Sequence, residues 1–533
     1  MRAIAGSVRE VPEKREDVRV MSEARAGESA RPGRGRRRLP RDPKRWARRM
    51  AGELRSRTLR AAQGSKPWAR RHRWFLAVLA LGTVLRALAM LGYRPALWFP
   101  DSYTYIVTVF RPRPDLVRPA GYSMFLKLLE PLHAFGAVTA AQHLLGLATG
   151  VLVYRAARRA PRWVATLATV PVLLDAYQVE LEHLLVSDTL FMFLVVAAVV
   201  LCQARRPATV VAIGLLLAAA TLTRTVGQPL IVVLAGWFVL RGRIRPAGVL
   251  LAAALVPIVA YGAWFYATYQ RVGIVGANGV FLYARTMSFA DCAEMDPPPD
   301  LRILCDPRPP ERRPPSQEYI WAKDSPLVLR PGITFSKEND DLAARFATLA
   351  ITSQPLDYAA SVLTELGRTF TWGRPVYPDP EVYAYYQFPV TEPGPPGRYP
   401  AQVGAEYAKL YEQGAIGTEI VEPQAGWLRA YQGMARLPGP VLLGILLVPP
   451  VAAFARRRGG RRLAAGPEWL VPWSAAVVLL ITPAAAAEFD YRYVLPAVPL
   501  ACLAAALSIR PDVREQSGGR KEFGDDIPPN VRL

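Results

Sequence analysis

Blocks of apolar residues, each about as long as a membrane is thick, constrain this chain more than any other feature. A helix that crosses the hydrocarbon core of a bilayer needs about 20 apolar residues. Such a block must be helical in lipid, because hydrocarbon offers no partner for backbone N–H and C=O groups. Ten blocks, three of them marginal, lie at 74–92, 137–154, 161–177, 184–203, 207–223, 226–240, 246–268, 437–455, 467–487 and 490–508. The sequence therefore predicts an all-α polytopic membrane protein with about ten transmembrane helices.

Basic residues at the ends of these blocks indicate the orientation of the chain, since Lys and Arg mark the cytoplasmic side. Residues 1–73 hold 23 Lys and Arg against eight Asp and Glu, and the chain as a whole carries a net charge of +23. Every second connection after that tail is also basic, with arginines near 155–162, 205–206, 241–245 and 456–462. The other connections carry acids instead. We expect a multi-pass cell-membrane protein whose tails, 1–73 and 509–533, are both cytoplasmic.

The basic tail allows two interpretations. A strongly cationic segment is typical of nucleic-acid binding, but it can equally contact anionic lipid at a membrane surface. Residues 1–73 are rich in Arg, Pro, Gly and Ala, a composition typical of disorder. The adjacent apolar block favours membrane lipid as the partner and no nucleic acid.

Two long connections fall on the predicted outer side. The membrane region 74–268 holds predicted helices 1–7, and the first outer loop, 93–136, lies between the first two of them. This loop contains a short apolar run, 124–132. We expect this run to lie in the membrane interface as an amphipathic helix, with Lys127 reaching the headgroups. The second, 269–436, is long enough for a mixed extracytoplasmic loop domain, followed by helices 8–10 at 437–508.

The sequence of this second loop predicts local structure and a disulfide. Apolar residues recur at helical spacing over 340–372, and Pro355 divides that run into two helices. Cys292 and Cys305 both fall outside the cytoplasm, where disulfides persist, so we expect a bridge between them. Tyrosines further along suit either a sugar- or lipid-facing surface or ordinary packing, and they are Tyr383, Tyr385, Tyr386 and Tyr407.

Polar residues near or within the hydrocarbon are the candidates for function, because their burial is unfavourable. Asp101 follows the first predicted helix and is either a functional acid or an ordinary loop acid. A second group comprises Asp175, Glu180, Glu182, His183 and, inside an apolar run, Asp188. Helix capping is the alternative role for Asp188. The natural cationic partners are Arg86, Arg224 and Arg492, of which the last two could instead be interfacial residues.

Acids and cations on the outer face, beside helices that can hold a lipid chain, suit sugar transfer from a polyprenyl phosphate. A carboxylate would deprotonate an acceptor hydroxyl, while cations would stabilise the departing phosphate.

Several segments resemble motifs of the GT-C superfamily of membrane glycosyltransferases, in particular its protein O-mannosyltransferases and lipid A aminoarabinose transferases. They are FPDSYTY at 99–105, RPAGYSMFL at 118–126, SDTLFMFL at 187–194, LTR at 222–224 and DYRYVLP at 490–496. The resemblance implies a GT-C fold with Asp101 as catalytic base and Lys127 and Arg492 as phosphate contacts. Further candidates for binding phosphate or sugar are Arg118, Tyr122, Asp188 and Arg224.

This chain departs from the family pattern at two positions, which leaves the substrate class open. Ser102 follows Asp101 where the mannosyltransferases have a second acid, and Asp188 stands where Glu is usual.

The leading hypothesis is an inverting glycosyltransferase that moves a sugar, a hexose or a pentose, from a polyprenyl-phosphate carrier to an extracytoplasmic glycan, lipid or protein. A polytopic transporter or lipid flippase is the alternative, although no convincing internal repeat supports it. An inactive membrane scaffold is a third possibility. The sequence indicates no cofactor with certainty and leaves a divalent metal possible.

Overall fold

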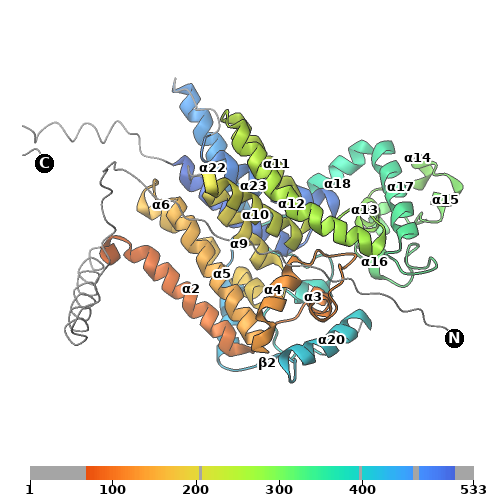
Figure 1. Cartoon of the computed structure of the whole chain (residues 1–533), viewed down its shortest axis with the longest axis horizontal. Helices are drawn as coiled ribbons and strands as arrows, with labels where there is room; N and C mark the ends of the chain where they lie inside the picture. Colours follow the sequence, from red (N-terminus) through yellow and green to blue (C-terminus); the bar gives the residue numbers. More distant parts are fainter. Residues whose placement is uncertain (1–67, 203–206, 395–398, 460–466, 510–533) are drawn as a thin grey trace, which may run out of the picture. The chain divides into compact units, whose positions relative to one another are not determined.

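The structure, a computed structural model, describes residues 68–202, 207–394, 399–459 and 467–509. Almost all of the two predicted tails lies outside the described residues. The described residues are 70% helical with almost no strand, and Figure 1 shows these helices coloured along the chain. The fold is therefore the all-helical membrane type that the apolar blocks predict.

Among the described residues, five helices are long and apolar enough to cross a membrane, or six when a bent helix pair counts as one span. The five are α2 (Arg73–Gly92), α5 (Phe135–Ala156), α12 (Ile244–Tyr269), α22 (Gly439–Arg458) and the run Tyr491–Ser508, which comprises α24 (Tyr491–Val494), η4 (Leu495–Ala497) and α25 (Val498–Ser508). Shorter apolar helices are α9 (Asp188–Leu201), α10 (Pro207–Thr223), α11 (Gln228–Leu240), which follows η2 (Thr225–Gly227), and α23 (Leu470–Ala486). Each of the ten predicted blocks thus contains helix.

Two of those blocks differ from the predicted continuous helices. The block at 161–177 is broken into α6 (Arg162–Leu167) and α7 (Val170–Leu174), and α8 (Ala176–His183) follows with a bend of 49°. The break occurs at Asp175, which adopts an extended conformation and whose carboxylate accepts hydrogen bonds from the backbone N–H groups of Tyr177 and Gln178. The block at 184–203 becomes helical only at Asp188, because Leu184 forms a parallel bridge with Leu97.

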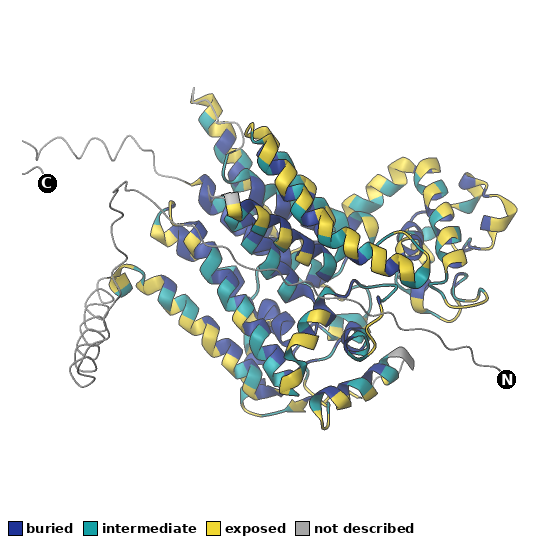
Figure 2. Cartoon of the chain, in the orientation of Figure 1, coloured by how far each residue is buried: buried dark blue, intermediate teal, exposed yellow. Residues whose placement is uncertain are grey.

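The apolar helices share one core and leave other faces open. The last span is 78% buried, whereas α12 is 22% buried and exposes residues such as Val256 and Val259. Figure 2 shows these exposed faces on the outer helices and the buried helices between them. Apolar faces of this extent suit contact with lipid.

The segment after α12 has a small core of its own. Its helices are α13 (Asn278–Thr286), α14 (Cys292–Met295), α15 (Pro299–Arg302), η3 (Pro310–Arg312), α16 (Glu318–Trp321), α17 (Lys337–Ser353) and α18 (Pro355–Arg368). Tyr283 and Phe346 are fully buried where α13 packs on α17. The run 340–372 forms two helices, as the sequence predicts, and α18 begins at Pro355.

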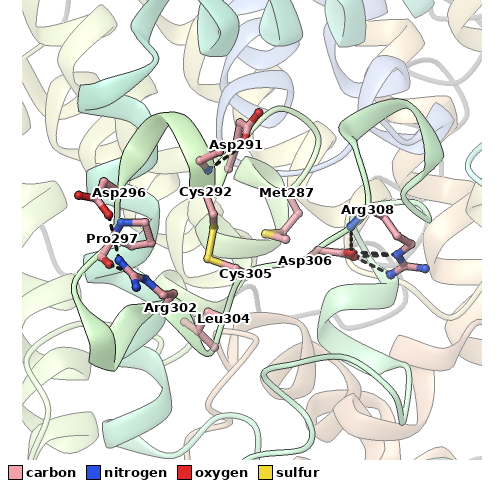
Figure 3. Close-up of a disulfide and its surroundings, with 12 residues drawn as sticks. Met287, Asp291, Cys292, Asp296, Pro297, Arg302, Leu304, Cys305, Asp306 and Arg308 are labelled. Carbon is pink, nitrogen blue, oxygen red and sulfur yellow. Dashed lines mark hydrogen bonds and ion pairs between the residues drawn. A yellow bond between two sulfur atoms is a disulfide. The ribbon is translucent and has the colours of Figure 1, made fainter.

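Cys292 and Cys305, the pair proposed from the sequence, form a disulfide in this segment (Figure 3). The bridge joins the start of α14 to the turn after α15, next to the Arg308–Asp306 ion pair.

The rest of the segment between α12 and α22, together with the segment between α2 and α5, packs on the ends of the apolar helices rather than on that small core. The elements involved are β1 (Tyr93–Arg94), α3 (Pro100–Phe110), α4 (Gly121–Leu129), η1 (Glu130–Leu132), α19 (Pro380–Ala384), α20 (Tyr399–Glu412), β2 (Glu419–Ile420) and α21 (Gln424–Met434). α20 lies along α3, α21 lies along α2, and β1 pairs with β2 in antiparallel fashion. These contacts cover the segment that carries Asp101.

A buried ion pair ties α2 to α8. Arg86 donates to both carboxylate oxygens of Glu182, with N–O distances of 2.7 Å, and His143 of α5 lies 3.1 Å from the same carboxylate. Gly146 of α5 faces this carboxylate so closely that a Cβ there would overlap it. Three helices therefore depend on one compact polar contact.

We predict that Gly146→Ala strongly destabilises the protein. The added methyl group must push Glu182 away from Arg86, and disrupting a buried ion pair typically costs about 3–5 kcal/mol. Thermal unfolding of the purified protein in detergent measures the loss. Gly236→Ala in α11 is the matched control, since nothing lies within 4 Å of a Cβ there. An unchanged midpoint for Gly146→Ala would contradict this account.

Candidate active site

Asp101 lies in the first turn of α3, where local sequence fixes its position. Pro100 occupies the first helical position, which suits a residue without an N–H group. The Ser102 hydroxyl accepts a hydrogen bond from the Phe99 N–H and closes the helix start. Asp101 is left 9% exposed, with its carboxylate directed to two arginines.

The two arginines come from distant parts of the chain. Arg118, from the loop between α3 and α4, donates to one oxygen of Asp101 at 2.5 Å. Arg492, from α24 at the start of the last span, donates to the other at 3.1 Å. Both oxygens of the carboxylate are therefore engaged by guanidinium groups.

Local contacts hold each arginine in place. The Asp115 carboxylate accepts the backbone N–H groups of Val117 and Arg118, which fixes that loop. Asp490 caps α24 by accepting the N–H of Arg492, and its other oxygen accepts the Tyr386 hydroxyl at 2.6 Å. The Arg492 guanidinium also lies 4.4 Å from the centre of the Phe99 ring.

These contacts set the charge of Asp101. Burial alone would raise the pKa of its carboxyl, but the charges and hydrogen bonds of Arg118 and Arg492 outweigh burial and lower the pKa to about 2. Asp101 in turn raises the pKa of Arg118 against the effect of burial. The group is a paired carboxylate at any physiological pH.

A second ion pair lies beside the first. Arg224, between α10 and α11, forms an ion pair with Asp188 at the start of α9. The Tyr493 ring lies 5.1 Å from the Arg224 guanidinium and 5.4 Å from that of Arg492, so one ring borders both pairs. Burial and the charge of Asp101 raise the pKa of Tyr105 to about 12, while its hydroxyl donates to Ser187 at 3.0 Å.

Five segments far apart in the sequence thus meet in one cluster. Its ionic members, which we call the carboxylate–arginine cluster, are Asp101, Arg118, Asp188, Arg224, Asp490 and Arg492. Each of the five motifs quoted from the sequence contributes at least one of them. One oxygen of Asp188 is buried without a hydrogen-bond partner among the described residues, which leaves it available to a polar ligand.

Other predicted site residues lie outside this cluster. Lys127 is exposed on α4 and pairs with Glu130, and it makes no contact with Asp101. Tyr122 is fully buried and donates to Gln142 at 2.6 Å, although its ring packs edge-on against Tyr105. Lys127 therefore lies outside the carboxylate–arginine cluster.

The secondary candidates serve mainly to hold α8. Asp175 caps that helix, Glu182 pairs with Arg86, and His183 bonds to His143 and to the Tyr93 carbonyl. Glu180 is also buried, and one of its oxygens has no hydrogen-bond partner in the described part of the chain. Glu180 therefore has an oxygen that a ligand can contact.

The sequence analysis quoted Asp490 and Tyr493 within a motif without giving them a role, and it left Tyr386 as either a sugar- or lipid-facing residue or a packing residue. The signal for Asp490 is its position two residues before Arg492, the spacing at which a carboxylate can cap the helix that carries the arginine. No sequence signal connects Tyr386 to Asp490, because 104 residues separate them.

A divalent metal has no evident ligand set here. Among the residues that the structure describes, no three His, Cys, Asp or Glu side chains gather in a way that could hold a metal ion. Both oxygens of Asp101 contact arginines instead. We therefore derive no step that involves a metal.

Comparisons with known proteins give a limited picture. No protein-family model and no curated protein match the chain. Two solved structures are similar. The Archaeoglobus fulgidus oligosaccharyltransferase matches 82% of this chain at 13% identity and a TM-score of 0.40. ArnT from Cupriavidus metallidurans also matches 82% of this chain, at 16% identity and a TM-score of 0.31. The chain spans half the length of the archaeal protein and 76% of ArnT. At this level, similarity says nothing about what the chain binds or catalyses.

A pair of carboxylates supports the loop that leads to Arg492. Glu488 accepts the backbone N–H groups of Ser316 and Gln317, and the Tyr377 hydroxyl lies 3.2 Å from Glu488 and 3.0 Å from Glu365. Burial raises the pKa of Glu488 from 4.5 to about 7, and the charge of Glu365 adds to the effect. This loop is therefore held by a group that titrates near neutral pH.

We predict that Glu488 makes the protein less stable as pH rises from about 5 to about 8. A carboxyl whose folded pKa is raised binds its proton more tightly in the folded state. That stabilisation is full below the unfolded pKa of 4.5 and is lost as pH passes through about 7. The shift corresponds to at most about 3 kcal/mol.

Thermal unfolding at pH 5 and pH 8 measures this effect. Glu488→Gln should narrow the difference between the two midpoints, because the amide does not titrate. Glu406→Gln, on the exposed face of α20, should leave the difference between the midpoints at pH 5 and pH 8 as in the wild type. An equal pH dependence in wild type and Glu488→Gln would exclude Glu488 as the cause.

Proposed function

We propose that the protein is a glycosyltransferase that moves a sugar from a polyprenyl-phosphate carrier to an acceptor outside the cytoplasm. The observation that carries this proposal is the meeting of Asp101, Arg118, Asp188, Arg224 and Arg492 in one buried cluster. A helical membrane protein with a base and several phosphate-binding cations at one site has the groups that this reaction needs. Both termini are then cytoplasmic, and the cluster faces the exterior.

Asp101 is the proposed base. The acceptor hydroxyl gives its proton to the Asp101 carboxylate while its oxygen attacks the anomeric carbon of the sugar. The bond from that carbon to the phosphate oxygen breaks, and the polyprenyl phosphate leaves with the electron pair. Attack opposite the leaving group inverts the configuration at the anomeric carbon.

The arginines have a double role in this scheme. In the structure Arg118 and Arg492 neutralise Asp101, and a carboxyl with a pKa of about 2 is a weak base. The donor phosphate is a competing anion that arginine binds well. When the phosphate takes one or both arginines, the pKa of Asp101 rises and the carboxylate becomes a stronger base beside the acceptor. Donor binding would thus activate the base, and the same cations would stabilise the departing phosphate.

The unpaired oxygens of Asp188 and Glu180 suit the sugar. Buried acceptors without partners favour a ligand that brings hydroxyl groups.

We predict that Asp101→Asn lowers sugar transfer by about 10²–10⁴-fold, the usual contribution of a general base. The assay uses a radiolabelled polyprenyl-phosphate sugar in proteoliposomes and measures labelled product. Asp341→Asn, an exposed acid on α17, is the matched control and should transfer at the wild-type rate. Thermal unfolding of each variant checks that the fold is kept.

Two results would overturn the proposal. Wild-type transfer by a folded Asp101→Asn variant would remove Asp101 as the base. Movement of label between leaflets without any product would identify a flippase instead.

A further inference from the structure

A cleft lies next to the carboxylate–arginine cluster but is lined by other residues. It has an empty volume of about 530 Å³, which includes space open to solvent. Its walls come from the end of α18 and the segment after it, from the start of α22, and from α24 to the start of α25. Tyr491 and Val494 of α24 line the cleft, whereas Arg492 of the same helix contacts Asp101. The two sites therefore share one short helix.

Three arginines give the cleft a positive charge. Arg374 lies against the rings of Tyr177 and Tyr491, at 3.5 and 4.2 Å from their centres, and its Nε is buried without a hydrogen-bond partner among the described residues. Arg368 pairs with Glu365. Arg436 makes no hydrogen bond or ion pair in the part of the chain that is described.

The acid that lines the cleft does not neutralise these arginines by direct contact. Asp175 accepts backbone N–H groups from Tyr177 and Gln178 with one oxygen and from Leu437 with the other. The cleft thus offers cations to an anion, and its carboxylate is already occupied by backbone donors. This pattern suits a phosphate better than a sugar.

The other walls are apolar and lie at the end of a membrane span. Leu442, in the first turn of the span α22, and Val494 and Val498 line the cleft. Trp372 also lines it and is 68% exposed. An exposed tryptophan beside the end of a span is typical of the level of the lipid headgroups.

We propose that this cleft binds the phosphate headgroup of an anionic phospholipid from the surrounding bilayer. The phosphate lies between Arg374 and Arg436, and the acyl chains follow the apolar wall along α22. Because the headgroup contacts Arg374, which packs on Tyr491, the bound lipid also supports the helix that positions Arg492. The proposal does not depend on the sugar-transfer reaction.

The test measures lipid retained by the purified full chain. The protein is loaded with mixed phosphatidylglycerol and phosphatidylcholine, washed with detergent and analysed by native mass spectrometry. Wild type should retain phosphatidylglycerol over phosphatidylcholine. Arg436→Gln should reduce that retention at least tenfold, and Arg436→Lys should keep part of it. Arg312→Gln, an exposed arginine outside the cleft, is the matched control and should retain lipid like wild type.

Further measurements distinguish which phosphate-containing molecule binds in the cleft. Asp101→Asn should retain phosphatidylglycerol normally, so failure of the catalytic proposal would leave this result intact. Inorganic phosphate at millimolar concentration should not displace the lipid, because it lacks the chains that contact Leu442. Displacement of phosphatidylglycerol by an equal concentration of a polyprenyl phosphate would assign the cleft to the donor and overturn the proposal. Equal retention by wild type and Arg436→Gln would overturn it as well.

Discussion

The contact of the Asp101 carboxylate with Arg118 and Arg492 is the interaction on which the rest of the site depends. It joins the first turn of α3 to the loop before α4 and to the start of the last span. Arg118 lies 17 residues and Arg492 lies 391 residues from Asp101 along the chain. A buried charge without a partner is strongly unfavourable. The three segments must therefore come together for these buried groups to remain charged. The packing of α20 on α3 and the hydrogen bonds that Asp115 and Asp490 accept from the backbone hold the segments in place.

This arrangement also explains how a buried, balanced cluster could be chemically active. The cluster holds three carboxylates and three guanidinium groups, so it carries no net formal charge at rest. An incoming phosphate shifts that balance, since it competes with carboxylates for the arginines. The same arginines thus balance the carboxylates in the empty site and bind the phosphate in the occupied site.

The sequence predicted the positions of the apolar helices because their signal is local, although among the described residues five or six, not ten, are long and apolar enough to cross a membrane. Length and hydropathy identify a span without any knowledge of its neighbours, and each of the ten blocks contains helix. The break before α8 also has a local cause, since Asp175 can cap the helix that follows. Residue types likewise made Asp101, Arg224 and Arg492 candidates, and the resemblance to the family motifs added Arg118.

Local sequence patterns could not predict which distant residues contact one another. Lys127 and Arg492 looked equally suitable for phosphate, yet only Arg492 contacts Asp101, because the path of the chain and not its composition decides which helix start lies beside α3. Arg86 was expected to pair with one of the acids between Asp175 and Asp188, but the sequence did not show that this acid is Glu182, 96 residues away. Such contacts depend on how helices pack, and one sequence read alone does not specify that.

A structure of the protein bound to a non-hydrolysable polyprenyl-phosphate sugar tests the central claim most directly. The account predicts that the phosphate contacts Arg118, Arg492 or both, that Asp101 has released at least one of them, and that its free oxygen faces the anomeric carbon. A phosphate bound elsewhere, with both arginines still on Asp101, would contradict it.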